Sequence, residues 1–119
     1  MPIPSGAVAW AQPLDPSDRA DFVVRWQALL TGGELIDTAT VTLLPEASAL
    51  GLTVIRDAAH GPFIADGTSI EMWLEIAQAQ RTNALFNAGA DLPLEILIET
   101  NATPPRRLQR TVVVRVTHL

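Results

Sequence analysis

Residues 70–76 read Ile70-Glu71-Met72-Trp73-Leu74-Glu75-Ile76. An apolar side chain at every second position predicts a β-strand with one buried face, because successive side chains point to opposite sides of a strand. The buried face would carry the isoleucines, the methionine and the leucine, and the two glutamates would face solvent. Trp73 falls on the outer face, where a tryptophan indicates a contact with another protein. If the register is reversed, Trp73 lies in the core.

The same period of two recurs on both sides of this stretch. It covers residues 22–26, 39–43, 52–54, 94–98 and 112–116, and a further short strand is possible at 63–65. Turn-forming glycine, proline and aspartate residues separate these runs. Helical patterning is confined to residues 77–88, which we expect to form one or two turns or a loop. Six or seven short strands predict an all-β domain, an antiparallel β-sandwich with Trp26 in its core.

The first 20 residues differ from the rest, and we expect them to form an extended N-terminal arm. Residues 21–119 would then form the β-sandwich domain. Prolines at positions 2, 4, 13 and 16 disfavour both helix and central strand in the arm. The arm nevertheless carries Trp10 and Leu14, and a wholly solvated tail gains nothing from a tryptophan. Trp10 would therefore lie either on its own domain or on a neighbouring subunit.

Length and composition limit the classes of function. The chain has 119 residues, the size of one domain, and it has no cysteine, which excludes disulfides and thiolate zinc sites. All eight basic residues are arginine, and 13 acidic residues give a net charge of −5. That balance argues against a nucleic-acid or anionic-membrane surface. The apolar runs are far shorter than the ~20 residues that span a bilayer, and no positively charged signal region opens the chain, so we expect no membrane span and no cleaved signal.

The charge is unevenly distributed along the chain. Residues 1–105 contain four arginines and all 13 acidic residues, a balance of −9, whereas residues 106–119 contain four arginines and no acid. The basic segment predicts pairing within the fold or docking on an acidic neighbour. Its first part, Thr103-Pro104-Pro105-Arg106-Arg107, is predicted to be a rigid turn between the last two strands. Such a turn would lose little entropy if it also contacted an acidic partner.

Residues that could carry chemistry are few. Asp57, His60 and Asp66 share one loop and could hold a hard metal ion, but aspartates in such loops ordinarily cap turns. Glutamates spaced four apart, at 71 and 75 and at 95 and 99, lie ~13 Å apart along a strand, too far for a glycosidase pair within one strand. We expect them on a solvated face or paired with Arg110 or Arg115. We therefore expect no enzyme, no cofactor and no metal site.

Several motifs occur in a fixed order along the chain. They are Asp15-Pro16, Asp21-Phe22-Val23-Val24-Arg25-Trp26-Gln27, Leu29-Leu30-Thr31-Gly32-Gly33, Leu35-Ile36-Asp37-Thr38-Ala39-Thr40-Val41, Gly51-Leu52-Thr53-Val54, Met72-Trp73-Leu74, Ile98-Glu99-Thr100-Asn101-Ala102-Thr103 and a final strand from Leu108 to Val116. In this order they resemble the small bacteriophage fibre–tail adaptor proteins. The chain departs from the family pattern at Arg25, at Val41 and over residues 77–92, which are similar to an insertion.

The resemblance implies an immunoglobulin-like antiparallel β-sandwich of about seven strands. It also implies a non-enzymatic virion structural protein of a tailed phage, prophage or phage-like particle, an adaptor that docks tail or fibre components. Its partners would be other virion proteins of the tail, fibre or capsid, in multiple copies per particle, without nucleic acid or membrane. The chain would be made in the bacterial host cytoplasm and reside in the virion. A head decoration or other accessory virion protein is one alternative, and a carbohydrate-binding β-sandwich module is another.

These considerations give five candidate protein-contact residues. They are Trp10, Leu14, Trp73, Arg106 and Arg107.

Overall fold

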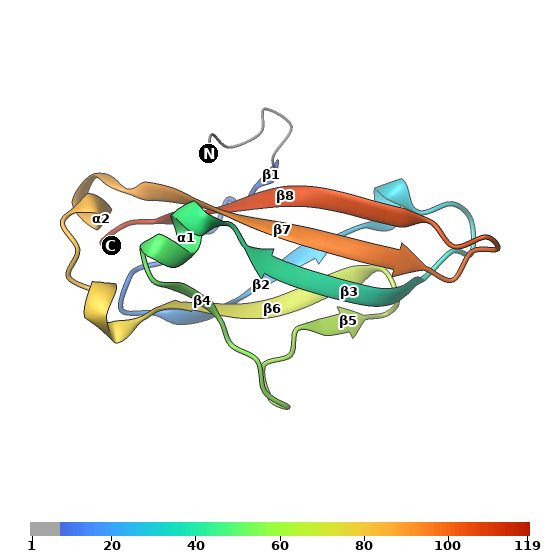
Figure 1. Cartoon of the computed structure of the whole chain (residues 1–119), viewed down its shortest axis with the longest axis horizontal. Coiled ribbons are helices and arrows are strands. Elements are labelled where there is room, and N and C mark those ends of the chain that lie inside the picture. The colour runs from blue at the N-terminus through green and yellow to red at the C-terminus, as the bar shows by residue number, and fades with distance from the viewer. Residues whose placement is uncertain (1–7) are drawn as a thin grey trace.

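The computed structural model describes residues 8–119, which form two facing β-sheets with a few short helices (Figure 1). The strands are β1 (Val8–Ala9), β2 (Arg19–Arg25), β3 (Ile36–Leu43), β4 (Leu52–Val54), β5 (Phe63–Ala65), β6 (Ser69–Ile76), β7 (Ala90–Thr100) and β8 (Arg107–Val116). The helical segments are η1 (Gln27–Leu29), α1 (Pro45–Ala49), η2 (Gln78–Gln80) and α2 (Leu85–Ala88). One sheet has the order β1-β8-β7-β3, and the other has the order β2-β6-β4 with β5 also paired to β6.

Strand β6 is the centre of the second sheet, and its alternation has the predicted register. Ile70, Met72, Leu74 and Ile76 are fully buried, while the residues between them are half-buried. The strand pairs antiparallel with β2 on one side and with β4 and β5 on the other. The prediction of a strand with one buried face at residues 70–76 is therefore confirmed, and the partly exposed Trp73 lies on the face away from the core.

The first sheet is built on the long antiparallel pair of β7 and β8, and β3 pairs with the other edge of β7. Every second side chain of these strands enters the space between the sheets. Together with β2, β4 and β6 they form one continuous hydrophobic core. Its largest fully buried members are Trp26, Phe22, Phe86, Leu14, Ile70, Met72, Leu74, Ile76, Leu92, Leu94, Ile96 and Ile98. The predicted core position of Trp26 is confirmed, at 1% exposure.

Two features differ from the expectation of a purely antiparallel sheet structure. Strand β1 pairs with β8 in parallel, with Val8 opposite Val112, because the chain runs along the edge of the first sheet before it crosses to β2 in the second. Helix α1 lies outside residues 77–88, to which the helical patterning was confined, and it begins at Pro45. Proline suits the first turn of a helix because the amide hydrogen it lacks has no partner there, and Ala47 anchors the helix in the core.

Residues 1–7 of the predicted arm lie outside the described part of the chain. The following residues run along the sandwich: the Trp10 amide donates to the Val113 carbonyl (3.0 Å), and the Leu14 amide donates to the Arg115 carbonyl (2.9 Å). Strand β2 then begins at Arg19. From residue 8 onward this segment is thus hydrogen-bonded to β8 of its own domain.

Candidate protein-contact site

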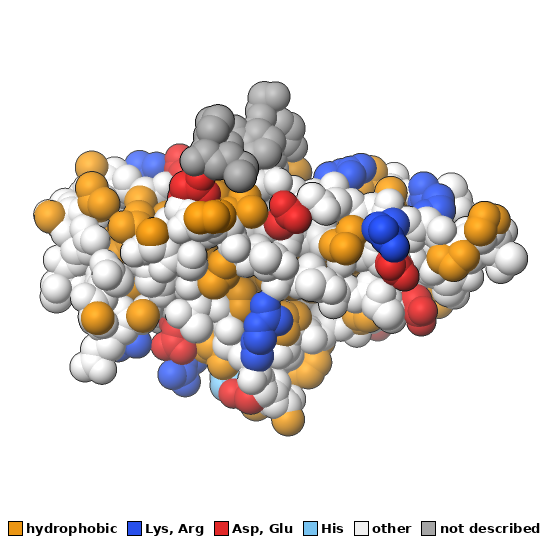
Figure 2. Space-filling model, viewed as in Figure 1, with side chains coloured by type: hydrophobic (Ala, Val, Ile, Leu, Met, Phe, Trp, Pro, Cys, Tyr) orange, Lys and Arg blue, Asp and Glu red, His pale blue; other side chains and the backbone are white. Residues whose placement is uncertain are grey.

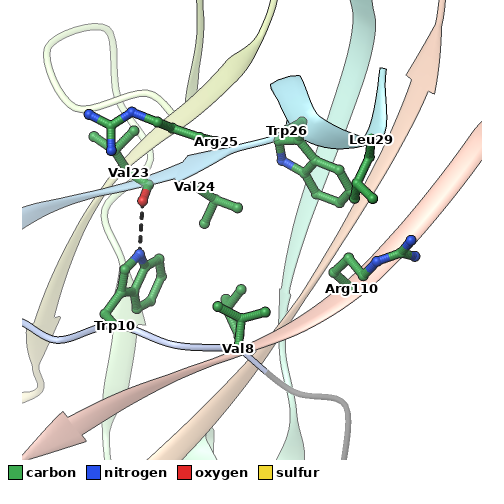
Figure 3. A pocket seen from close by; sticks show the side chains of 9 residues that line it. Val8, Trp10, Val23, Val24, Arg25, Trp26, Leu29 and Arg110 are labelled. Atoms are coloured by element: carbon green, nitrogen blue, oxygen red, sulfur yellow. Dashed lines mark hydrogen bonds between the residues drawn. The ribbon is translucent and has the colours of Figure 1, made fainter. Parts of the chain in front are cut away.

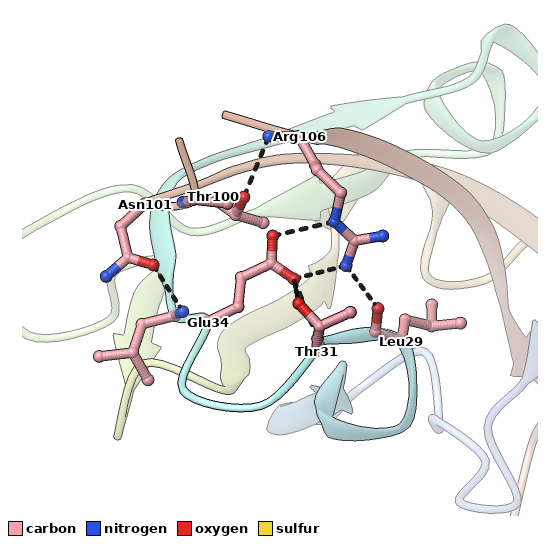
Figure 4. Close-up of polar contacts among 8 residues, drawn as sticks. Leu29, Thr31, Glu34, Thr100, Asn101 and Arg106 are labelled. Carbon is pink, nitrogen blue, oxygen red and sulfur yellow. Dashed lines mark hydrogen bonds and ion pairs between the residues drawn. The ribbon is translucent and has the colours of Figure 1, made fainter. Parts of the chain in front are cut away.

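The turn between β7 and β8 brings Arg106 against Glu34 (Figure 4). The Arg106 Nε donates to Glu34 Oε2 (2.9 Å), and its Nη2 donates to Glu34 Oε1 and to the Leu29 carbonyl (2.7 Å). The Thr31 amide donates to the same carboxylate (3.0 Å), whose side chain is only 3% exposed. The Thr100 hydroxyl accepts from the Arg106 amide (3.1 Å). These hydrogen bonds connect the loop after β2 to the turn between β7 and β8.

The same contacts determine the charge state of Glu34. The Arg106 guanidinium, with help from Thr100 and the Thr31 amide, holds the pKa of the Glu34 carboxyl well below its ordinary value. A bidentate arginine–carboxylate pair is a strong, charge-assisted contact. Arg106 was predicted as a candidate contact for a partner protein, and the structure shows its guanidinium engaged within its own fold.

The other arginines of the basic segment differ in their surroundings. Arg107 lies in solvent and forms a surface pair with Glu99 (3.2 Å), and Arg115 forms one with Asp91 (3.0 Å). Exposed pairs of this kind contribute under about 1 kcal/mol. Pairing of the basic segment within the fold is thus present, but in the described chain none of the glutamates at 71, 75, 95 and 99 pairs with Arg110 or Arg115. Glu75 pairs instead with Arg19 and Arg81. Arg110 has no acidic partner in the described part of the chain.

Trp73 lies beside the loop between β4 and β5. The ring of His60 meets the Trp73 indole edge-on, with 5.2 Å between the centroids. His60 is held there by Asp57, whose carboxylate lies 2.7 Å from the imidazole Nδ1 and accepts from the backbone of the same loop. That contact lowers the pKa of Asp57. His60 thus covers part of Trp73, which is half-buried overall.

The proposed cation site in this loop is not formed. Within residues 8–119 no three histidine, aspartate or glutamate side chains come close enough together to hold a metal ion. Asp57 caps a turn, in keeping with the alternative considered for these residues.

The arm residues occupy different depths. Leu14 is fully buried in the core and leaves no side-chain surface for a partner. Trp10 is half-buried: its ring lies 4.9 Å from that of Phe22, and its Nε1 donates to the Val23 carbonyl (2.9 Å). Since the Trp10 backbone bonds to β8 and its side chain bonds to β2, this residue joins the edges of the two sheets. Of the two positions expected for Trp10, the structure shows the one on its own domain.

A cavity of about 320 Å³ opens beside Trp10, between the edges of the two sheets (Figure 3). Arg25 and Arg110 lie at its rim, and the remaining wall is apolar. The apolar wall consists of Val8, Trp10, Val23, Val24, Trp26, Leu29 and Val112. Sequence reasoning missed this cavity. Its residues come from three separate segments, and of them only Trp26 and Val112 are buried.

The five candidate residues therefore do not form one surface. Trp10 and Leu14 are held by β8 and β2, Trp73 lies on the outer face of β6, and Arg106 and Arg107 lie at the β7–β8 turn. Figure 2 shows positive and negative side chains interspersed over one face of the molecule. No helix within residues 8–119 has the length and hydropathy to cross a membrane.

Comparisons with known proteins add no relatives. No protein-family model matches the chain, and a search of curated proteins finds no match.

Proposed function

We propose that this chain is a non-enzymatic virion structural protein, an adaptor with an immunoglobulin-like sandwich that docks tail or fibre components of a tailed phage, prophage or phage-like particle. The observation that carries the proposal is the ordered set of turn and strand motifs that resembles the fibre–tail adaptors. Such a protein needs complementary surfaces and a rigid frame, and no catalytic group.

Three structural details support this proposal. The motif that ends in Trp26 forms β2 and places the tryptophan in the core. The Gly32-Gly33 motif forms the turn before β3, and residues 51–54 lead into and form β4. The motifs thus occupy the turns and core positions that an adaptor-like sandwich requires. The surface adds an open apolar cavity and a solvent-exposed Arg107, features suited to contacts with other proteins.

The proposal is tested by locating the chain in particles. Particles released from the source bacterium would be purified on a density gradient, and the chain would be detected in them by mass spectrometry and by immunogold electron microscopy. We expect the chain to co-purify with particles and the gold to lie on the tail. Gold on the head would favour the decoration-protein alternative. Recovery of the chain only outside the particle fractions would overturn both.

A further inference from the structure

Among the strands of residues 8–119, none pairs with one of the two edges of β2. The Trp26 amide donates to the Thr68 carbonyl on the β6 side, and in an antiparallel pair the backbone groups of alternate residues face opposite edges. The groups of Asp21, Val23 and Arg25 therefore face away from β6. Within the described residues, one bond to them is seen on that side, from Trp10 Nε1 to the Val23 carbonyl. The Val23 amide and both backbone groups of Asp21 and Arg25 stay open in the described chain.

The cavity lies directly against this open edge and contains a buried polar group without a partner. The Nε1 of Trp26 is buried and makes no hydrogen bond to any residue from 8 to 119. Figure 3 shows this nitrogen on the side of the ring that is turned toward Val24 and the open space. A buried donor without an acceptor is unfavourable. Because this nitrogen has essentially no accessible surface, a carbonyl oxygen in the cavity satisfies it only if the Trp26 ring turns toward the cavity.

The rim of the cavity is positively charged. Arg25 and Arg110 both line the cavity, the Arg25 guanidinium lies beside Val23, across the β2 ribbon from Val24 (Figure 3), and neither forms an ion pair with an acidic residue in the described chain. An apolar cavity between two arginines fits a ligand with an apolar centre and acidic flanks. Backbone donors and acceptors spaced along an edge are the features that recognise an extended peptide.

We propose that an extended segment of a partner protein adds to the open edge of β2 and inserts an aliphatic side chain into the cavity. Carboxylates beside that side chain meet Arg25 and Arg110, and a carbonyl oxygen accepts from Trp26 Nε1 after the indole ring turns toward the cavity. The inference rests on the proposed function only for the expectation that the partner is another particle protein.

A second copy of the chain fits this edge less well. Pairing of two β2 strands about Arg25 would place like charges opposite each other, which is unfavourable. Pairing about Val23 would need the carbonyl that Trp10 already occupies. The open edge thus favours a different partner with acidic residues.

The test uses the full chain and a synthetic peptide, acetyl-Thr-Ser-Val-Asp-Leu-Asp-Val-Ser-Thr-amide. Its binding would be followed by nuclear magnetic resonance of the backbone amides and the three indole N–H groups, with the Trp26 signal assigned from Trp26→Phe. We expect the Trp26 indole proton to shift downfield and the Val23 and Arg25 amides to gain protection from exchange. A peptide with lysine in place of both aspartates should bind at least about tenfold more weakly, since it reverses the charge match.

Two pairs of variants separate the edge from the cavity. Leu29→Glu places a charge in the cavity wall, and Leu85→Glu is its control, because Leu85 is 58% exposed and lies outside the cavity. We expect at least about tenfold weaker binding from the first and no change from the second. Arg25→Pro removes an N–H that faces away from β6, so that the pairing with β6 is retained. Arg25→Pro should abolish binding, whereas Arg25→Ala retains part of it. Unchanged β7 and β8 amide signals would verify that each variant is folded.

The outcomes distinguish this inference from the proposed function. The inference is overturned if millimolar peptide changes neither the Trp26 indole signal nor the β2 amide signals. It is also overturned if Leu29→Glu and Leu85→Glu weaken peptide binding equally. A wild-type dimer in sedimentation equilibrium that Arg25→Pro dissociates overturns it in favour of a second copy. Normal incorporation of Leu29→Glu into particles overturns it while leaving the adaptor function intact. Absence of the wild-type chain from particles overturns the adaptor function, and the peptide experiment still decides the inference.

Discussion

Replacement of Trp10 by alanine is the most informative single change to this fold. Trp10 is bonded to β8 through its backbone and to β2 through its indole, so it joins the open edges of the two sheets. The substitution deletes the bond to the Val23 carbonyl and the packing on Phe22, and it leaves the backbone bond to Val113 in place. The perturbation is thus confined to one side-chain connection between sheets.

The magnitude follows from the contacts of the ring. A buried hydrogen bond contributes about 1 kcal/mol, and an aromatic pair contributes about 1 kcal/mol beyond the area that it buries. Loss of a fully buried tryptophan costs about 3–5 kcal/mol, and Trp10 is half-buried. We expect Trp10→Ala to lower the free energy of unfolding by about 2–3 kcal/mol, which corresponds to a fall in Tm of about 10 °C for a domain of this size. Trp10→Phe keeps a ring against Phe22 and should lose only about 1 kcal/mol.

The assay is thermal and urea unfolding followed by far-ultraviolet circular dichroism. Val8→Ala is the control, because Val8 lies in the same segment and is largely exposed, and it should change the free energy of unfolding by less than about 0.5 kcal/mol. If Trp10→Ala unfolds at the wild-type midpoint, the Trp10 side chain contributes nothing to the free energy of unfolding and the reasoning is refuted. Equal losses in Trp10→Ala and Trp10→Phe would instead assign the whole effect to the hydrogen bond.

Two further predictions concern the loops. Because Arg106 holds the pKa of Glu34 below its ordinary value near 4.5, the stability from this pair is present above that pH and is lost as pH falls below it; the difference in unfolding free energy between wild type and Glu34→Gln should therefore shrink from pH 5 to pH 3, and a constant difference would contradict this. Gly51 has a φ of +87°, and an added Cβ would lie 2.8 Å from the Gln80 Cγ, so Gly51→Ala should destabilise by about 1–3 kcal/mol in urea unfolding. Gly32→Ala is its control, since nothing lies within 4 Å of the added atom; equal effects at the two glycines would exclude local crowding as the cause.

The strands could be predicted from the sequence because the period of two is a direct consequence of one-sided burial. Residues 70–76 show this best, since each apolar side chain enters the core and each glutamate does not. The parallel pairing of β1 could not be predicted in this way. Its direction depends on the path of the chain between the two sheets, and two residues are too few to show a period. Helix α1 was missed for a similar reason, because five residues after Pro45 give little more than one turn.

The candidate site was harder to predict than the fold because side-chain partners lie far apart in sequence. Arg106 was predicted as exposed on a basic turn, but its partner Glu34 lies 72 residues earlier. The same holds for Trp26. Its position in a strand indicated a core residue, which is confirmed, but the lack of an acceptor for its indole among the described residues could not be read from that strand. Burial can be read from a local pattern, whereas the satisfaction of a buried polar group depends on the whole fold.

Trp10 also determines how much of the β2 edge is open. Its indole occupies the Val23 carbonyl, so a strand that adds to this edge finds a full pair of backbone groups at Asp21 and Arg25 but not at Val23. Natural sheets protect their edges with charges or with covering side chains. On the β2 edge, Trp10 covers one position and Arg25 places a charge at another. The covered carbonyl opposes pairing about Val23, and the arginine opposes pairing of identical strands. One side chain therefore connects the stability of the sandwich to the selectivity of its open edge, because the contact that joins the sheets is also the contact that limits which strand can add.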